Sequence, residues 1–165
     1  MTHKLEKALK WIVCIFQKNE VPFQITGGFA AHIYGAKRQV NDIDIDIPEN
    51  MMKFLIPDIQ EYVTFGPGRY KDERWNLKLI TLNYKTQEID IGGAFETKIF
   101  DDMNNQWKHI PAHFEMCQIH TIFGMRIPVI SPEELIAYKK LLSGEHQKGD
   151  IEAVKQYMYE NCNLQ

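Results

Sequence analysis

The chain has 165 residues, of which 44% are hydrophobic and 25% are charged, and these are ordinary values for a globular protein. Its formal net charge of -3 gives no general reason to expect a nucleic acid as partner. The longest apolar run near the start, Trp11 to Phe16, is far shorter than the ~20 residues of a membrane span, and we expect no signal peptide. The three cysteines are scattered and form no CxxC pair, so we expect a reducing, cytoplasmic location.

The first half of the chain predicts alternating helices and strands. Apolar residues spaced by three and four predict an amphipathic helix over residues 4–19. A glycine pair, Gly27-Gly28, then separates a short strand from a brief helix, and Pro48 ends the next strand. The predicted elements are a strand over 21–26, a helix over 29–35, a strand over 40–47 and a helix over 49–61.

The second half predicts strands followed by helices. Glycine and proline mark residues 65–75 as a loop, strands follow over 77–83 and 87–92, and residues 93–120 favour only irregular strands and loop. A hairpin is expected over 119–130. Ser131 and Glu134 have the spacing of a capping box and predict a helix to about residue 142. The segment SGEHQKGD should break it, and Asp150 should cap a last helix over 150–159.

Helices and strands alternate in the first half of the chain, and strands precede helices in the second half. This order indicates an α/β fold of the α+β kind, with a mixed sheet and packed helices. We expect a single domain over residues 1–165, with a core over about 1–130 and C-terminal helices over about 131–160. The sequence gives no information on the oligomeric state.

Three aspartates, Asp42, Asp44 and Asp46, alternate with isoleucines in the strand predicted over 40–47. Residues two apart in a strand lie on one face, roughly 6.5 Å apart along the chain, so these like charges repel one another. Either water on an exposed face or a cation must compensate. Carboxylates at this separation can bind a divalent cation, and Mg²⁺ combines few carboxylates with water and phosphate oxygens.

Two further features favour the cation over a merely exposed strand. Glycines at a strand-to-helix turn let phosphate approach the backbone N–H groups of Gly27 and Gly28, although a glycine pair alone is more often a simple turn. Asp90, in the segment EIDIGG, lies in a later predicted strand. It supplies a third carboxylate if the two strands are neighbours, and it is an ordinary exposed residue if they are not.

This arrangement of a glycine pair, a D-x-D motif and a later strand aspartate resembles the nucleotidyltransferase superfamily of the DNA polymerase beta type. Thirteen residues, Phe29 to Asn41, separate the glycines from Asp42, and Arg38 lies four residues before that aspartate. The short chain and its helical end are most similar to the small bacterial lincosamide nucleotidyltransferase-like group. Many relatives carry serine at the second glycine, so Gly28 removes a hydroxyl from the phosphate site.

The resemblance implies transfer of a nucleoside monophosphate from a nucleoside triphosphate (NTP) to a hydroxyl of a small, possibly antibiotic-like acceptor, with Mg²⁺ or alternatively Mn²⁺. It implies that Asp42 and Asp44 ligate the metal, and that Asp90 is the third ligand or the base. Gly27 and Gly28 would bind the triphosphate. The remaining candidates are Arg38, which meets a phosphate or pairs with Asp46, and Lys139, which approaches the nucleotide or is a surface lysine.

Two other functions remain open from the sequence. One is adenylylation of a protein partner, and the other is a catalytically inactive module that binds a nucleotide or a partner. The aromatic stretch over residues 95–114 either forms a wall of an acceptor pocket or packs in the core, and the sequence leaves both open.

Overall fold

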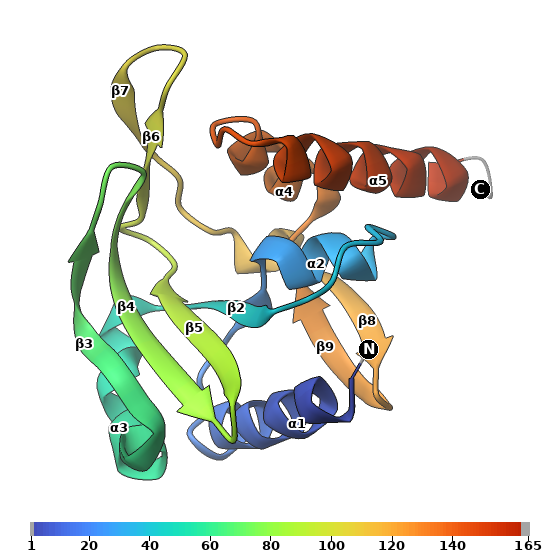
Figure 1. Cartoon of the computed structure of the whole chain (residues 1–165). Helices are drawn as coiled ribbons and strands as arrows, with labels where there is room; N and C mark the ends of the chain where they lie inside the picture. Colours follow the sequence, from blue (N-terminus) through green and yellow to red (C-terminus); the bar gives the residue numbers. More distant parts are fainter. Residues whose placement is uncertain (1, 163–165) are drawn as a thin grey trace.

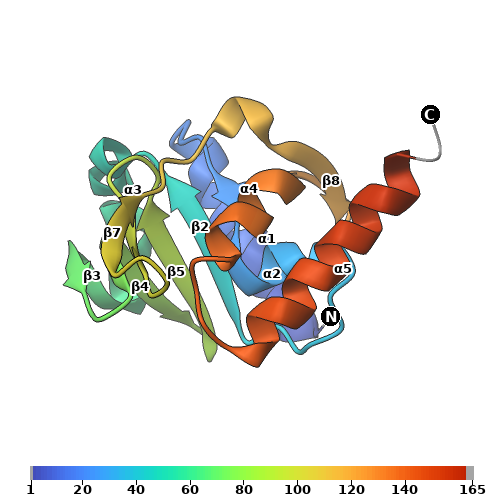
Figure 2. The ribbon, with the colours of Figure 1, turned by 90° about the horizontal axis from the view of Figure 1, so that it is seen from above.

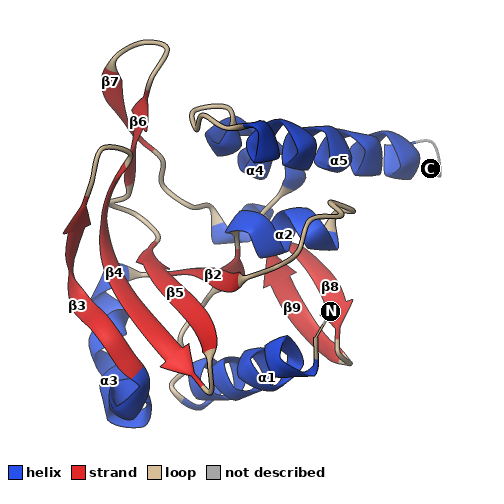
Figure 3. Ribbon diagram, in the orientation of Figure 1, coloured by secondary structure: helices blue, strands red, loops and turns tan. Residues whose placement is uncertain are grey.

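The computed structural model describes residues 2–162, and it shows a curled mixed β-sheet with five α-helices packed around it (Figure 1, Figure 3). The helices are α1 (His3–Lys18), α2 (Gly27–Ile33), α3 (Met52–Ile59), α4 (Pro132–Lys139) and α5 (Glu145–Cys162). The strands are β1 (Gln24–Ile25), β2 (Asp42–Ile47), β3 (Val63–Lys71), β4 (Trp75–Tyr84), β5 (Gln87–Gly93), β6 (Lys98–Asp101), β7 (Gln106–His109), β8 (Gln118–Ile122) and β9 (Met125–Val129). Short 3-10 turns cover Glu49–Met51, Gln60–Tyr62 and Phe114–Met116.

Hydrogen bonds join the strands in the order β7-β6-β4-β5-β2-β1-β9-β8, and β3 pairs with β4 beside this path. Strand β2 is parallel to β5, and β1 is parallel to β9, whereas the other pairs are antiparallel. The sheet is therefore mixed, and the predicted fold class is confirmed.

Helix α1 confirms the amphipathic pattern of the first helix. The Thr2 hydroxyl accepts a hydrogen bond from the Leu5 N–H at 3.3 Å and so caps the first turn. The apolar face of α1 is buried in the core, with Ala8, Leu9 and Ile12 fully inaccessible. No helix among residues 2–162 combines the length and the apolar character needed to cross a membrane.

Strand β2 has one buried face and one partly exposed face, as its alternation predicts. Ile43, Ile45 and Ile47 are buried in the core, and the intervening aspartates are only partly buried. Isoleucines on one face of the strand therefore fix its register and turn the carboxylates to the other face.

The loop predicted over residues 65–75 is wrong, since residues 63–71 form strand β3 at the edge of the sheet. Its glycines belong to an irregularity in the pairing with β4, where the register shifts. Gly66 has a φ of +83°, and a Cβ on it would meet the backbone oxygen of Leu79 at 2.1 Å. Glycine is therefore needed for a bulge here, and the sequence pattern of a bulge is easily mistaken for that of a loop.

The predicted break between the last two helices is confirmed at residues 140–144, but its extent over SGEHQKGD is wrong, because α5 begins at Glu145. Asp150 consequently lies inside the helix, and the predicted cap at Asp150 is wrong. Buried contacts of Asp150 and Val154 hold this part of α5 against the protein. These contacts outweigh the cost of about 1 kcal/mol that Gly149 imposes on a helix. Seen from above in Figure 2, α5 lies across α2 and beside α4.

Candidate active site

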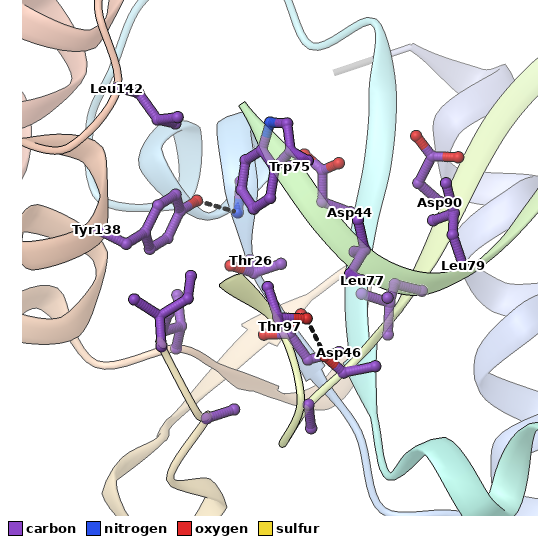
Figure 4. Close-up of a pocket in the computed structure, with 18 of the residues that line it drawn as sticks. Thr26, Asp44, Asp46, Trp75, Leu77, Leu79, Asp90, Thr97, Tyr138 and Leu142 are labelled. Carbon is purple, nitrogen blue, oxygen red and sulfur yellow. Dashed lines mark hydrogen bonds between the residues drawn. The ribbon is translucent and has the colours of Figure 1, made fainter. Parts of the chain in front are cut away.

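A cavity of about 810 Å³ lies between the sheet and the helices α2, α4 and α5. Strands β2, β4 and β5 form one wall, and the other wall comes from the beginning of α2, from α4 and from the start of α5. Figure 4 shows side chains from these separate elements converging on the same space. The cavity is therefore built by residues that are distant in the sequence.

Two of the three predicted carboxylates face each other across neighbouring strands of this wall. Asp44 on β2 lies directly opposite Asp90 on β5, and both line the cavity. Neighbouring strands are about 4.8 Å apart, so the two side chains start from adjacent positions on one surface. Asp42 lies one step further along β2, opposite Glu88. Asp42 is not a wall residue, but its charge reaches the other two carboxylates.

Burial makes the ionised forms of Asp44 and Asp90 unfavourable. Burial, with a smaller contribution from the charges of Asp42 and Asp90, raises the pKa of Asp44 to about 8, against opposing effects of the Gly28 N–H and Lys139. Burial is also the main cause of the raised pKa of Asp90. A cation in the cavity would relieve this penalty.

The oxygen donors of Asp42, Asp44 and Asp90 fit a hard divalent ion. All three side chains offer carboxylate oxygens, and Asp90 Oδ1 is buried with no hydrogen-bond partner among residues 2–162. The side chains do not already form a metal-ready cluster, because no group of three Asp, Glu, His or Cys residues in the described chain is close enough. Asp44 Oδ2 instead accepts a hydrogen bond from the Gly28 N–H at 3.3 Å. The three aspartates fit the metal by chemistry and by strand register, and binding requires their side chains to turn.

The glycine pair forms the edge of the cavity next to Asp44. Gly27 has a φ of +64°, and a Cβ on it would lie 1.7 Å from Asp44 Oδ2, so any other residue would be strained and would displace the Asp44 side chain. The Gly27 N–H donates to the hydroxyl of Tyr138 at 2.9 Å, and the Gly28 N–H donates to Asp44. Both N–H groups predicted to bind triphosphate therefore have protein oxygens as partners, and a phosphate oxygen would replace them.

Arg38 and Lys139 meet at one carboxylate of helix α5. Arg38 Nε donates to both oxygens of Asp150, at 3.0 and 3.1 Å, so its suggested pairing with Asp46 is wrong. Lys139 is only 2% exposed and donates to Asp150 and to Gln147, at 2.9 Å each. Lys139 lines the cavity, and its interpretation as a surface lysine is therefore wrong.

Asp46 faces the other end of the cavity. Gln24 donates a hydrogen bond to its carboxylate at 3.1 Å. Burial raises the pKa of Asp46 to about 7, and the nearby acids Glu134 and Glu49 contribute. Glu134 is itself 2.5 Å from His113 Nδ1. This end of the cavity is consequently acidic.

A largely apolar surface connects the two ends. Trp75, Leu77 and Leu79 alternate along β4 and line the cavity (Figure 4). The aromatic rings of residues 95–114 contact one another, in the pairs Phe95–Phe114 and Phe100–Trp107, and do not line it. The stretch nevertheless forms part of the wall through other residues, among them Thr97, Ile110 and Pro111. The aromatic contribution to the cavity comes instead from Trp75, which the period-two pattern of β4 could have identified.

Comparison with known proteins assigns this architecture. The family model of aminoglycoside-2''-adenylyltransferase matches residues 8–156. No curated protein matches the sequence.

Several solved structures share the fold. A Thermotoga maritima protein assigned as a nucleotidyltransferase has a TM-score of 0.70 and 21% identity, with 97% of this chain and 96% of that chain covered. The lincosamide antibiotic adenylyltransferase LnuA, solved with lincomycin, has a TM-score of 0.61 and 17% identity, with coverages of 92% and 97%. ANT(2'')-Ia in complex with adenylyl-2''-tobramycin has a TM-score of 0.62 and 14% identity, with coverages of 96% and 92%. The nucleotidyltransferase-type fold expected from the sequence is thereby confirmed.

Proposed function

The chain belongs to the aminoglycoside-2''-adenylyltransferase family and is thus a nucleotidyltransferase, and we propose that it moves a nucleoside monophosphate from an NTP to a hydroxyl of a small acceptor with Mg²⁺. The observation that carries this proposal is the position of Asp44 directly opposite Asp90, on the wall of a cavity edged by Gly27 and Gly28. We treat residues 1–165 as one catalytic domain. A cytoplasmic location agrees with the free cysteines.

Asp42, Asp44 and Asp90 are the proposed metal ligands, for Mg²⁺ or Mn²⁺. When bound, the metal supplies positive charge that stabilises the phosphates during transfer. The unfavourable ionisation of Asp44 and the unpartnered oxygen of Asp90 both support this assignment. Asp90 is also the candidate that accepts the proton of the acceptor hydroxyl, since its raised pKa suits a base.

The nucleotide site is proposed at Gly27, Gly28, Arg38 and Lys139. The two glycine N–H groups offer hydrogen bonds to phosphate oxygens, and the cations of Arg38 and Lys139 neutralise the triphosphate charge. The acceptor oxygen then forms a bond to the α-phosphorus, the bond to the bridging oxygen breaks, and pyrophosphate leaves. This reaction depends mainly on positioning and on charge stabilisation.

The acceptor is proposed to lie between the apolar surface of β4 and the acidic end of the cavity. Trp75 and Leu77 offer an apolar surface, and the carboxyl groups of Asp46 and Glu134 offer hydrogen-bond acceptors. A hydroxylated acceptor that also carries an amine fits this combination best. Lincomycin and tobramycin, which appear in the structures of LnuA and ANT(2'')-Ia, support a small-molecule acceptor of this kind.

Pyrophosphate release measures the reaction directly. The purified protein is incubated with Mg²⁺, each of the four NTPs and a panel of amine-bearing and amine-free hydroxylated compounds. We expect release that needs the NTP, the metal and an acceptor, and that is lost in Asp90→Asn. Tight NTP binding with no release would favour the inactive module, and release only with a protein acceptor would favour protein adenylylation.

A further inference from the structure

We propose that Asp150 is a positioning residue that holds the cations of Arg38 and Lys139 at the nucleotide site. This inference rests on the proposed function and adds a residue of helix α5 to it. Asp150 is only 2% exposed and lies inside the helix. It therefore acts through the two cations and does not itself touch the nucleotide.

Both oxygens of Asp150 are engaged. Arg38 Nε donates to Oδ1 at 3.0 Å and to Oδ2 at 3.1 Å, and Lys139 Nζ donates to Oδ2 at 2.9 Å. Gln147 accepts a second hydrogen bond from Lys139 at 2.9 Å. One buried carboxylate thus fixes two cations that come from different parts of the chain, the segment after α2 and the end of α4.

The guanidinium of Arg38 points from Asp150 towards the glycine pair. If Gly28 had a Cβ, it would lie 2.1 Å from Arg38 Nη2 and 3.1 Å from Nη1. The guanidinium therefore occupies the space that a side chain at position 28 would fill. Because Arg38 binds Asp150 through Nε, its two Nη groups are left without a hydrogen-bond partner among residues 2–162.

The charges around the cluster leave room for an anion. Asp150 carries one negative charge against two positive ones, and Gly28 and Lys139 border the cavity. Asp42 and Asp44 also act on Arg38, but a divalent ion at these carboxylates would take up their charge. A buried ion pair adds little stability compared with apolar packing. The excess of positive charge at Gly28 instead suits the phosphates of an NTP.

The first experiment substitutes Asp150 and measures nucleotide binding. The probes are the α,β-methylene analogues of ATP and GTP with Mg²⁺, titrated by calorimetry, together with KM for the NTP and kcat. Asp150→Asn should weaken binding and raise KM about 10- to 100-fold, because two charge-assisted contacts lose their anchor. Asp150→Glu should restore part of the loss. Glu152→Gln, an exposed change on the same helix, is the matched control and should leave all three values unchanged.

The second experiment is a double-mutant cycle, which tests the contact between Arg38 and Gly28 that the proposal requires, whether or not Asp150→Asn folds. Gly28→Ala places a methyl group on the Arg38 guanidinium and should weaken analogue binding about tenfold or more. In an Arg38→Ala background the same change should cost nothing further, since the guanidinium is gone. Independent, additive effects would overturn the proposal.

The outcomes separate this inference from the proposed function. Wild-type protein that binds neither analogue would refute the proposed function and the inference together. Wild-type protein that binds, with a folded Asp150→Asn variant of unchanged affinity and KM, would refute the inference alone. A loss of thermal stability without a change in KM would likewise assign Asp150 a purely structural role.

Discussion

Replacing Asp44 by asparagine should stabilise the metal-free protein while abolishing transfer. Burial and the neighbouring charges raise the pKa of Asp44 from 3.8 to about 8, so its ionised form is unfavourable in the folded state. The unfolded chain ionises this group freely at pH 7. Asparagine carries no charge, and its side-chain oxygen can still accept the hydrogen bond from Gly28.

The size of the effect follows from this pKa difference. One pKa unit corresponds to about 1.4 kcal/mol, so at pH 7 the proton that Asp44 takes up on folding costs at most about 4 kcal/mol of unfolding free energy. The side chain is only partly buried and water screens part of its charge, so we expect a gain of about 1–3 kcal/mol. For a chain of this length, that raises Tm by about 3–10 °C.

The stability gain of Asp44→Asn over the wild type should depend on pH. A raised folded-state pKa means that the folded state holds the proton more tightly, so stability is retained below pH 3.8 and is lost as the pH rises to about 8. The advantage of Asp44→Asn should therefore be absent near pH 3.8 and largest near pH 8. The assay is thermal unfolding in EDTA across this range.

A matched control has the opposite sign. Asp58 accepts hydrogen bonds from Lys18 and Asn19, and the contact with Lys18 lowers its pKa, so Asp58→Asn should lose stability at neutral pH. Added Mg²⁺ should stabilise the wild type more than Asp44→Asn, because one proposed ligand is missing. Transfer by Asp44→Asn should fall by a factor of about 100 or more. A variant no more stable than wild type in EDTA, or one that transfers at the wild-type rate, would refute this reasoning.

Three further substitutions test other parts of the site. Gly27→Ala should weaken binding of the ATP analogue and destabilise the fold by more than Gly35→Ala. Both glycines have a positive φ, but only a Cβ at position 27 meets Asp44. Equal losses of stability in thermal unfolding would contradict this. Tyr138→Phe should lower metal-free stability by about 1 kcal/mol and raise affinity for the analogue about fivefold, because phosphate no longer competes with the hydroxyl for the Gly27 N–H. Weaker analogue binding in calorimetry would show that the hydroxyl contributes to the nucleotide site. Glu134→Gln should raise KM for an amine-bearing acceptor about tenfold at constant KM for the NTP, and steady-state kinetics with an amine-free acceptor supplies the comparison.

Local patterns predicted the elements at the centre of the fold. Alternation of aspartate and isoleucine placed β2, and the capping residues Ser131 and Glu134 placed the start of α4, where the Glu134 N–H donates to the Ser131 hydroxyl at 3.3 Å. These signals depend on neighbours in the chain, and they are therefore readable from it. The proximity of β2 and β5 was inferred from a family resemblance and did not follow from the pattern itself.

The contacts of Arg38, Lys139 and Asp150 could not be predicted in the same way. Asp150 lies 112 positions from Arg38 and 11 positions from Lys139 in the sequence. The sequence spacing of a lysine is also the same whether that lysine is buried or exposed. The cap assigned to Asp150 was wrong because the contacts that extend α5 to Glu145 are tertiary. Trp75 was missed because it lies at the end of the loop predicted over 65–75, whereas β4 begins at this residue.

The most direct test of the account is a crystal structure with Mn²⁺ and the α,β-methylene analogue of the preferred NTP, with data collected at the manganese edge. We predict anomalous density in contact with carboxylate oxygens of Asp44 and Asp90, next to phosphate oxygens at Gly27 and Gly28. Manganese bound elsewhere, with the Asp44 carboxylate still on the Gly28 N–H, would contradict it.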